Sequence, residues 1–409
     1  MAKRKVVITG MGAVSPFGWN SSLMVDGMLA NACALVLMNE NDQIEGMQAK
    51  VAGKAPYFDA KIIPREHRRS MSHMSIMALV AANEALEQAG IKPGLPLAPE
   101  YCAMGSSIAS TISSANALED FFSGYLISKD VTQVRSTVFF KVMSHAVPSN
   151  LSVSLGLTGR CLSPSSACAG GLQALGMAYE SILAGREKRM ICGGAEEFHG
   201  LFPATFDRLG AATHNPDPDT AAKPFDATRD GIVCSEGAGV FVLEDAEAAA
   251  ERGAEPIAEV LGFHTNSSPL SIVSPDTDSI VRCMNGALID AGLKPADISL
   301  VNAHATSTEH GDIAEGNAIA QLFGNKIAVN SLKGYMGHTM AASGAVELIA
   351  TLKAAKRGKA LGTRNLTSLD PRCGDINVFA ASTAFGGDLM LKNSFGLGGV
   401  NASLVLKML

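Results

Sequence analysis

The sequence predicts an α/β fold, because short apolar segments typical of buried strands alternate with longer segments of helical periodicity. The first strand is expected over 5–10, where an apolar run leads into a glycine turn. A helix is expected over 74–89, ending before Gly90, and further core strands over 189–194 and 239–244. This alternation favours mainly parallel sheets.

A second cycle of strands and helices begins near residue 253. Its expected elements lie at 257–262, 279–291, 298–302, 341–356 and 394–406, the last including a glycine-rich turn. The halves 1–252 and 253–409 are each expected to form a layered unit rich in βαβ connections. No linker rich in proline or serine divides them, so they are expected to form one integrated body.

The composition limits the class of protein. The chain has 409 residues, of which 47% are hydrophobic and 18% charged, enough to bury a substantial core. A net charge of −6, five tyrosines and one tryptophan disfavour nucleic acid as a partner. No uninterrupted apolar run approaches the ~18 residues of a membrane-spanning helix, and no export signal is convincing. The predicted location is therefore the cytoplasm, with no membrane association.

Metal and dinucleotide sites are not predicted. The eight cysteines show no C-x-x-C spacing, which argues against a zinc ribbon or a dithiol redox motif. The glycines at 10 and 12 follow a strand but lack the third glycine of a dinucleotide-binding loop. His304, His310 and Asp312 have a spacing that matches no metal-binding motif.

Cys168 stands in a setting typical of a nucleophile. Turn-forming residues at 163–166 precede it, and 172–183 has the pattern of a helix packed on a core. A thiol at a helix N-terminus meets the positive end of the dipole, which would lower its pKa. The small residues at 169–171 would leave room for a large group near the sulfur. Taken alone, Cys168 could also be a small buried apolar residue.

Two histidines flank predicted strands and helices. His304 follows the strand at 298–302, at the edge where α/β folds gather their ligand sites, although it could be a structural histidine bonded to backbone. His338 precedes the helix at 341–356, where the dipole would keep its imidazole neutral. A neutral imidazole can donate a hydrogen bond to a developing oxyanion.

Other polar residues accompany the histidines. Lys333 could tune the field there or bind an anion, and Glu347 could pair with it, because a buried charge needs a partner. Thr306 and Thr308 could line a polar channel or cap the next helix. The glycine-rich segment 393–401 could bring backbone N–H groups next to a reacting carbonyl, or could be an ordinary hairpin turn.

Taken in order, these segments resemble the β-ketoacyl-acyl-carrier-protein synthases, within the thiolase-fold condensing enzymes. The resemblance covers essentially the whole chain and is carried by residues 6–12, 166–169, 224–231, 236–239, 301–308, 333–338 and 393–396. It is closest to the elongating types I and II, which have a Cys-His-His triad, and less close to the initiating type with Cys-His-Asn. It implies a thiolase-like five-layered α-β-α-β-α body of two similar halves, 1–252 with the nucleophile and 253–409 with both histidines.

The resemblance also implies the chemistry. Cys168 would accept an acyl chain from a carrier-protein phosphopantetheine as a thioester. His304 and His338 would stabilise the enolate oxygen that forms as malonyl-carrier protein loses CO2, and the carbanion would attack the thioester in a Claisen condensation. The product would be two carbons longer. Lys333 and Glu347 would be a supporting ion pair, and neither a metal nor a cofactor beyond the carrier's phosphopantetheine is expected.

Binding roles follow from the same resemblance. The backbone N–H groups of Cys168 and Leu397 would form an oxyanion hole. The residues expected to contact substrate are Ile108 in the acyl pocket, Thr306 and Thr308 at the pantetheine arm, and Phe395. The implied partners are an acidic acyl carrier protein and a second ketosynthase chain, in a homodimer or a heterodimer. The carrier protein would dock on a basic patch formed by Lys61, Arg65, Arg68, Arg69 and Lys129.

The chain departs from the family pattern close to the expected site. Leu397 stands where the family usually has a phenylalanine that gates the pocket, and Ala305, Met336 and Val400 also replace usual residues. These changes predict a specialised synthase for a polyketide, a polyene or an unusual fatty acid. A degradative thiolase is disfavoured, because it needs a second reactive cysteine in a C-terminal Cys-x-Gly turn. A non-catalytic chain-length subunit is disfavoured because it would lack the nucleophile.

Overall fold

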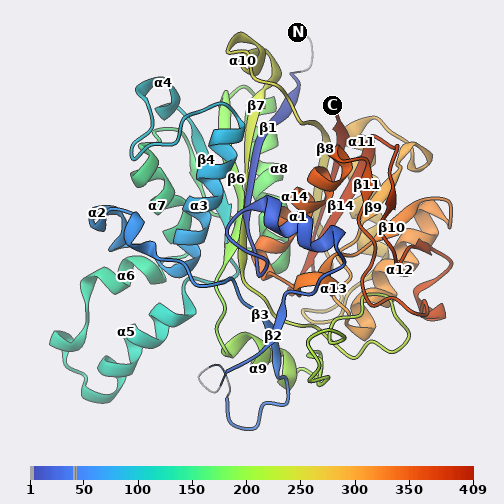
Figure 1. Cartoon of the computed structure of the whole chain (residues 1–409), viewed down its shortest axis with the longest axis horizontal. Coiled ribbons are helices and arrows are strands. Elements are labelled where there is room, and N and C mark those ends of the chain that lie inside the picture. The colour runs from blue at the N-terminus through green and yellow to red at the C-terminus, as the bar shows by residue number, and fades with distance from the viewer. Residues whose placement is uncertain (1–3, 40–41, 43) are drawn as a thin grey trace.

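One mixed sheet of eleven strands runs through the protein (Figure 1). The computed structural model describes residues 4–39, 42 and 44–409. Across the sheet the strands are β12 (Asn377–Val378), β10 (Ala328–Asn330), β9 (Leu300–Asn302), β14 (Leu389–Gly396), β15 (Val400–Met408), β8 (Ala258–Ser267), β1 (Val6–Val14), β7 (Gly237–Asp245), β6 (Arg189–Glu196), β4 (Gly105–Ala109) and β5 (Cys161–Leu162).

The prediction of mainly parallel sheets is wrong, since five of the ten strand pairings are antiparallel. In the first half β7 and β1 run against both of their neighbours, and in the second half β15 and β8 do so. For β15 the cause is local. It follows β14 after three residues, too few for the crossover that a parallel neighbour requires.

The two halves have the same topology. In the first half the sheet order is β5-β4-β6-β7-β1, and in the second it is β10-β9-β14-β15-β8, with matching strand directions. The first strand of each half lies at the centre, where β1 pairs with β8 over Val6–Ile8. This short antiparallel pairing joins the halves into one body.

Helices form three layers around the two half-sheets. Helices α3 (His73–Gln88) and α7 (Ala146–Leu155) cover the outer face of the first half. Helices α11 (Thr277–Ala291) and α12 (Glu309–Phe323) cover the outer face of the second. Between the half-sheets lie α8 (Gly170–Leu183) and α14 (Ser343–Lys356), whose apolar side chains pack on strands of both. The five-layered α-β-α-β-α fold is therefore confirmed.

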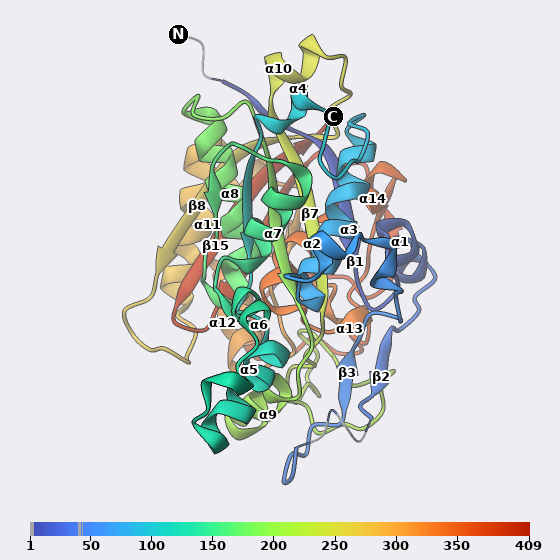
Figure 2. The same cartoon turned by 90° about the vertical axis from the view of Figure 1, so that its left-hand side faces the viewer.

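Shorter elements lie at the periphery. They are α1 (Ser21–Leu29), β2 (Leu35–Leu37), β3 (Val51–Gly53), α2 (Arg65–Arg68), α4 (Pro99–Cys102), α5 (Ala115–Ser128), α6 (Ser136–Val142), α9 (Leu201–Arg208), α10 (Ala246–Glu251), α13 (Lys333–Met336), β11 (Lys359–Ala360) and β13 (Thr383–Ala384). Both views show α5 and α6 projecting from the body at the same end as the β2–β3 ribbon and α9 (Figure 2). Among the helices of the described residues, none is long and apolar enough to cross a membrane.

The glycines near the N-terminus do not form the expected turn. Strand β1 continues through Gly10 and Gly12 as far as Val14. A Cβ at Gly10 would lie 1.9 Å from the carbonyl oxygen of Ala85, and one at Gly12 would lie 2.2 Å from that of Ala81. These glycines therefore let α3 lie close against the sheet.

A second close approach brings α8 and α14 together. A Cβ on Gly171 would lie 2.4 Å from the carbonyl oxygen of Ala341, and one on Gly194 would lie at the same distance from that oxygen. The small residue at 171 therefore accommodates the neighbouring helix, and the prediction that it leaves room for substrate is wrong. Ala341 lies in the 3-10 turn that leads into α14.

We predict that Gly171→Ala lowers the stability by ~1–3 kcal/mol, because the added methyl group must displace the Ala341 carbonyl. Calorimetry would report this as a lower Tm. The control is Gly386→Ala, at a position where a Cβ meets no atom within 4 Å. Equal Tm values for the two variants would contradict this account of the packing.

Candidate active site

Cys168, His304 and His338 meet at one cavity of about 340 Å³. The Cys168 sulfur and one ring nitrogen of each histidine all lie within 4.8 Å of one another. The two imidazole rings are 5.1 Å apart between centroids, in an edge-to-face arrangement. The three residues come from different parts of the chain, so the fold alone brings them together.

Cys168 lies in a 3-10 turn over Ala167–Ala169, directly before α8. The residue before it, Ala167, has a φ of 46°, in the left-handed region that disfavours a side chain. The Ser394 hydroxyl donates a hydrogen bond to the Cys168 carbonyl oxygen at 2.9 Å. Next to it, a Cβ on Gly396 would lie 2.6 Å from the Ser166 carbonyl oxygen. The end of β14 is thereby held directly against the cysteine turn.

The thiol of Cys168 does not have the lowered pKa that its place before a helix predicts. Burial raises the pKa of Cys168 to about 12, although Lys333 and the backbone N–H groups of Cys168 and Leu397 act in the opposite direction. Burial outweighs the helix terminus because a thiolate loses its hydration in the closed site. The resting thiol is therefore protonated at neutral pH, and a nearby base must take its proton.

His304 follows β9 and is fixed through its backbone. The carboxylate of Glu315, on α12, accepts hydrogen bonds from the N–H groups of His304 at 2.9 Å and Ala305 at 2.6 Å. The Asn393 amide donates to the same carboxylate at 3.0 Å. Sequence reasoning missed Glu315, because it is one of several polar residues in α12 and nothing local distinguishes it from a solvent-facing one.

His338 is held through its backbone by one segment of the first half, residues 233–235. Its N–H donates to the Val233 carbonyl at 2.8 Å, and its carbonyl accepts from the Ser235 N–H at 2.9 Å. Among the described residues no group accepts or donates a hydrogen bond at either ring nitrogen of His338, or at Nδ1 of His304. These buried nitrogens therefore have hydrogen-bonding capacity that the described residues do not use.

Both imidazoles are neutral. Burial and then the charge of Lys333 hold the pKa values of His304 and His338 well below the usual range. The neutral state was predicted for His338 from a helix dipole, but desolvation is the larger cause. A neutral imidazole can donate one hydrogen bond and accept another.

Lys333 and Glu347 form the predicted ion pair, with Nζ 2.7 Å from a carboxylate oxygen and both side chains buried. A second buried lysine, Lys392 on β14, lies 2.6 Å from the other oxygen of Glu347. Although burial opposes it, the two ammonium groups lower the pKa of Glu347 to about 2. Sequence reasoning missed Lys392, which was marked only by being a charged residue inside an apolar strand.

Two family models match this chain. The model of the β-ketoacyl synthase N-terminal domain matches residues 3–249, and that of the C-terminal domain matches residues 257–367. The chain belongs to the β-ketoacyl synthase family. These enzymes are acyltransferases and need no metal or small-molecule cofactor.

Individual relatives of this β-ketoacyl synthase align over their whole length. The 3-oxoacyl-[acyl-carrier-protein] synthase 2 of Synechocystis sp. is 32% identical over 417 residues, covering 100% of this chain and 99% of the relative. The crystal structure of a β-ketoacyl synthase from Burkholderia phymatum is 37% identical, with a TM-score of 0.94, over 99% of this chain and 100% of that one. A ketosynthase solved with its type II polyketide synthase acyl-carrier protein and bound to the hexaketide is 26% identical, with a TM-score of 0.89, over 100% of both chains.

Some of the other residues predicted for the site of the synthase lie at the cavity, and others do not. Thr306, Thr308, Phe395 and Leu397 line the cavity. Ile108 is buried in β4 within the core beneath α3 and α7 and is not among the residues that line it. The docking candidates Lys61, Arg65, Arg68, Arg69 and Lys129 lie at or near the surface, on or beside α2 and at the end of α5.

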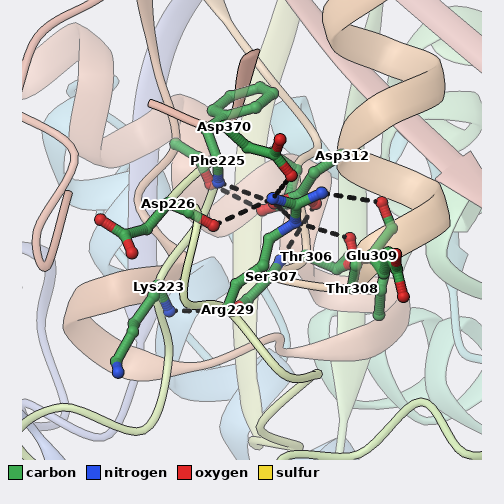
Figure 3. A network of polar contacts seen from close by, with 12 residues as sticks. Lys223, Phe225, Asp226, Arg229, Thr306, Ser307, Thr308, Glu309, Asp312 and Asp370 are labelled. Carbon is green, nitrogen blue, oxygen red and sulfur yellow. Dashed lines mark hydrogen bonds and ion pairs between the residues drawn. The ribbon is translucent and has the colours of Figure 1, made fainter. Parts of the chain in front are cut away.

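A buried arginine organises the loop that carries the two threonines (Figure 3). The Arg229 guanidinium donates to the backbone carbonyls of Thr308 at 3.2 Å and Glu309 at 2.9 Å. It also pairs with the carboxylates of Asp370 at 2.7 Å and Asp312 at 3.5 Å. The planar guanidinium can make these contacts at once because its donors are arranged as a fork.

Asp312 holds two turns of the same loop cluster. Its carboxylate accepts from the N–H groups of Phe225 at 2.7 Å and Ser307 at 3.1 Å, whose φ angles are 64° and 71°. Left-handed backbone is unfavourable for these residue types, so it persists only where neighbouring contacts hold it. The hydroxyls of Thr306 and Thr308 lie 2.9 Å apart at the cavity wall.

We predict that Arg229→Met lowers the stability of the synthase by ~3–5 kcal/mol, because it leaves the buried carboxylate of Asp312 without an ion-pair partner and removes the buried partner of Asp370. Arg372→Met is the matched control. Arg372 also pairs with Asp370, but its side chain is 55% exposed, so its loss should cost no more than ~1 kcal/mol. Denaturant unfolding measures both, and similar losses would contradict the role assigned to Arg229.

Proposed function

We propose that this protein extends an acyl chain by two carbons through a decarboxylative Claisen condensation between an acyl thioester on Cys168 and malonyl-acyl-carrier protein. The main support is the approach of the Cys168 sulfur to both histidines within 4.8 Å. A covalent thioester divides the reaction into two easier steps. We also propose that the chain is organised as two halves. Residues 1–252 carry the nucleophile, and residues 253–409 carry the two histidines.

In the first step, the Cys168 sulfur attacks the carbonyl carbon of an acyl chain borne on the carrier's phosphopantetheine. Since burial keeps the thiol protonated, a neutral imidazole takes its proton as the sulfur–carbon bond forms. The backbone N–H groups of Cys168 and Leu397 bind the developing oxyanion. The pantetheine sulfur then leaves with the proton from the imidazole.

In the second step, the thioester oxygen of malonyl-carrier protein accepts hydrogen bonds from His304 and His338. Loss of CO2 places the electron pair on the enolate, whose charge the two neutral donors stabilise. The carbanion carbon attacks the carbonyl of the Cys168 thioester, a carbon–carbon bond forms, and the Cys168 thiolate leaves and takes up one proton from solvent. Thr306 and Thr308 position the pantetheine arm along the cavity wall.

The partner that delivers both substrates is an acyl carrier protein. The ketosynthase solved with its own acyl-carrier protein supports this assignment. We propose Lys61, Arg65, Arg68, Arg69 and Lys129 as its docking patch, because carrier proteins are acidic.

The exposed apolar side chains of α5 and α6, including Ile127 and Phe139, favour association with a second ketosynthase chain. We place this activity in the cytoplasm.

The substrate is proposed to be a specialised acyl chain, bulkier or stiffer than a simple saturated one. Leu397 stands on the turn between β14 and β15, at the cavity and 40% exposed. A branched aliphatic side chain there takes less space than the aromatic gate usual in the family. The alternative function is that of a non-catalytic chain-length subunit. It is disfavoured because Cys168 and both histidines are retained.

We predict that Cys168→Ala removes both the acyl adduct and condensation, lowering turnover by at least ~1,000-fold. His304→Ala and His338→Ala should each retain the adduct, because the remaining imidazole can still take the thiol proton. Each should lose malonyl decarboxylation by ~100–1,000-fold, since it removes an enolate donor. Intact-mass spectrometry measures the adduct, and CO2 release measures decarboxylation. An adduct that survives in Cys168→Ala would show that another residue is the nucleophile.

We predict that Leu397→Phe lowers turnover of unsaturated or aryl-containing primers by ~10-fold or more while sparing short saturated ones. The larger ring narrows the passage but leaves the backbone N–H in place. Carrier-protein assays with matched saturated, unsaturated and aryl primers measure this. The idea of a specialised synthase fails if the unmodified enzyme turns over simple saturated primers best.

A further inference from the structure

A buried carboxylate lies between two buried ammonium groups beside the histidine pair. Lys392 Nζ is 2.6 Å from one oxygen of Glu347 and 3.4 Å from the Ala303 carbonyl. Lys333 Nζ is 2.7 Å from the other oxygen, which also accepts from Ser343 at 2.5 Å. All three charged side chains are at most 1% exposed. Ala303 directly precedes His304, so Lys392 contacts the segment that carries this histidine.

One lysine already neutralises Glu347, so the second adds an uncompensated charge. A buried ammonium group loses its hydration, and an apolar side chain of similar length would fill the position without that cost. The other titratable groups that interact with this cluster include Cys168, Glu315 on α12, His304 and His338. Burial raises the pKa of Glu315, which weakens it as a counter-charge. Lys392 therefore makes the surroundings of both imidazoles more positive.

We propose that Lys392 is a positioning residue for the histidine pair. Its ammonium group keeps His304 and His338 neutral, and its contacts with Glu347 and the Ala303 carbonyl hold the His304 segment in place. This inference rests on the proposed function in one respect, namely that neutral imidazoles donate hydrogen bonds to the enolate oxygen. A protonated histidine could not accept the Cys168 proton in the acylation step.

The electrostatics of the site agree with this geometry. After burial and Lys333, the charge of Lys392 is a further cause that lowers the pKa values of both histidines. Burial lowers the pKa of Lys392 itself to about 8, although Glu347 opposes this. The charge of Lys392 is therefore present at neutral pH and is lost as the pH rises through about 8.

The experiment compares Lys392→Met and Lys392→Gln with the unmodified protein. The methionine variant removes the charge and both contacts, whereas the glutamine variant can still donate hydrogen bonds. Lys407→Met on the neighbouring strand β15 is the control, because that lysine is about half exposed. Two properties are measured against pH: the ¹⁵N resonances of labelled histidines, and CO2 release from malonyl-carrier protein.

We expect both Lys392 variants to raise the imidazole pKa values by about 1 unit or more, because a nearby positive charge has been removed. In the pH profile of CO2 release, the rise on the acid side should move to higher pH. The variants should lower kcat by a larger factor than they raise KM. In the unmodified protein the imidazole resonances should also report a titration near pH 8 that both variants lose. Lys407→Met should change none of these.

The two proposals fail in different ways. If the imidazole pKa values and the acid limb stay unchanged in a folded Lys392 variant, the role of Lys392 is overturned, whatever the activity. If Lys392→Met does not fold, Lys392→Gln carries the same test. If the imidazole pKa values shift but the unmodified protein neither forms an adduct nor releases CO2, the role of Lys392 stands and the proposed condensation fails.

Discussion

The contact between the Ala341 carbonyl and two glycines determines the geometry of the site. Gly171 and Gly194 lack the Cβ atoms that would otherwise separate α14 from α8 and β6. Cys168 directly precedes α8, and His338 lies shortly before α14, so the approach of the two helices also sets the separation of nucleophile and histidine. The same two helices fill the space between the half-sheets. The close packing of α8 against α14 therefore both fills the core and sets the positions of the site residues.

The position of the site between the two half-sheets accounts for the shifted pKa values of its residues. Cys168, His304 and His338 are all buried, and burial is the leading cause of the pKa shift at each of them. It raises the pKa of the thiol and lowers those of the imidazoles, leaving all three neutral. Charges persist there only in direct contact with opposite charges, as in the Lys333–Glu347 pair. A neutral triad suits chemistry in which charge develops only during the reaction.

The sequence was sufficient to predict several of the strands and helices and the three residues that meet at the cavity, but not the buried polar residues that support the site. Strands and helices depend on local patterns, and Cys168, His304 and His338 stand in short recognisable motifs. Arg229 lies in the segment 224–231 that carries the family resemblance, but no role was predicted for it, and Lys392 lies outside those segments. Both residues act through partners distant in the chain, which local patterns do not reveal. The antiparallel directions of β7 and β15 were also not predicted, because they depend on neighbouring strands that are not identified by local sequence. Only the assembled sheet shows which strands become neighbours.

The chemistry and the selection of substrate depend on different parts of the structure. The turn between β14 and β15 is held by its backbone: the Gly398 N–H donates to the Ile272 carbonyl, and the Gly399 carbonyl accepts from Ser268, both at 2.7 Å. Glycines with φ of 94° and 74° set its shape. The Leu397 N–H can thus face Cys168 whatever side chain residue 397 carries. That side chain is free to vary with the acyl group, because neither the oxyanion donor nor the histidine pair depends on it.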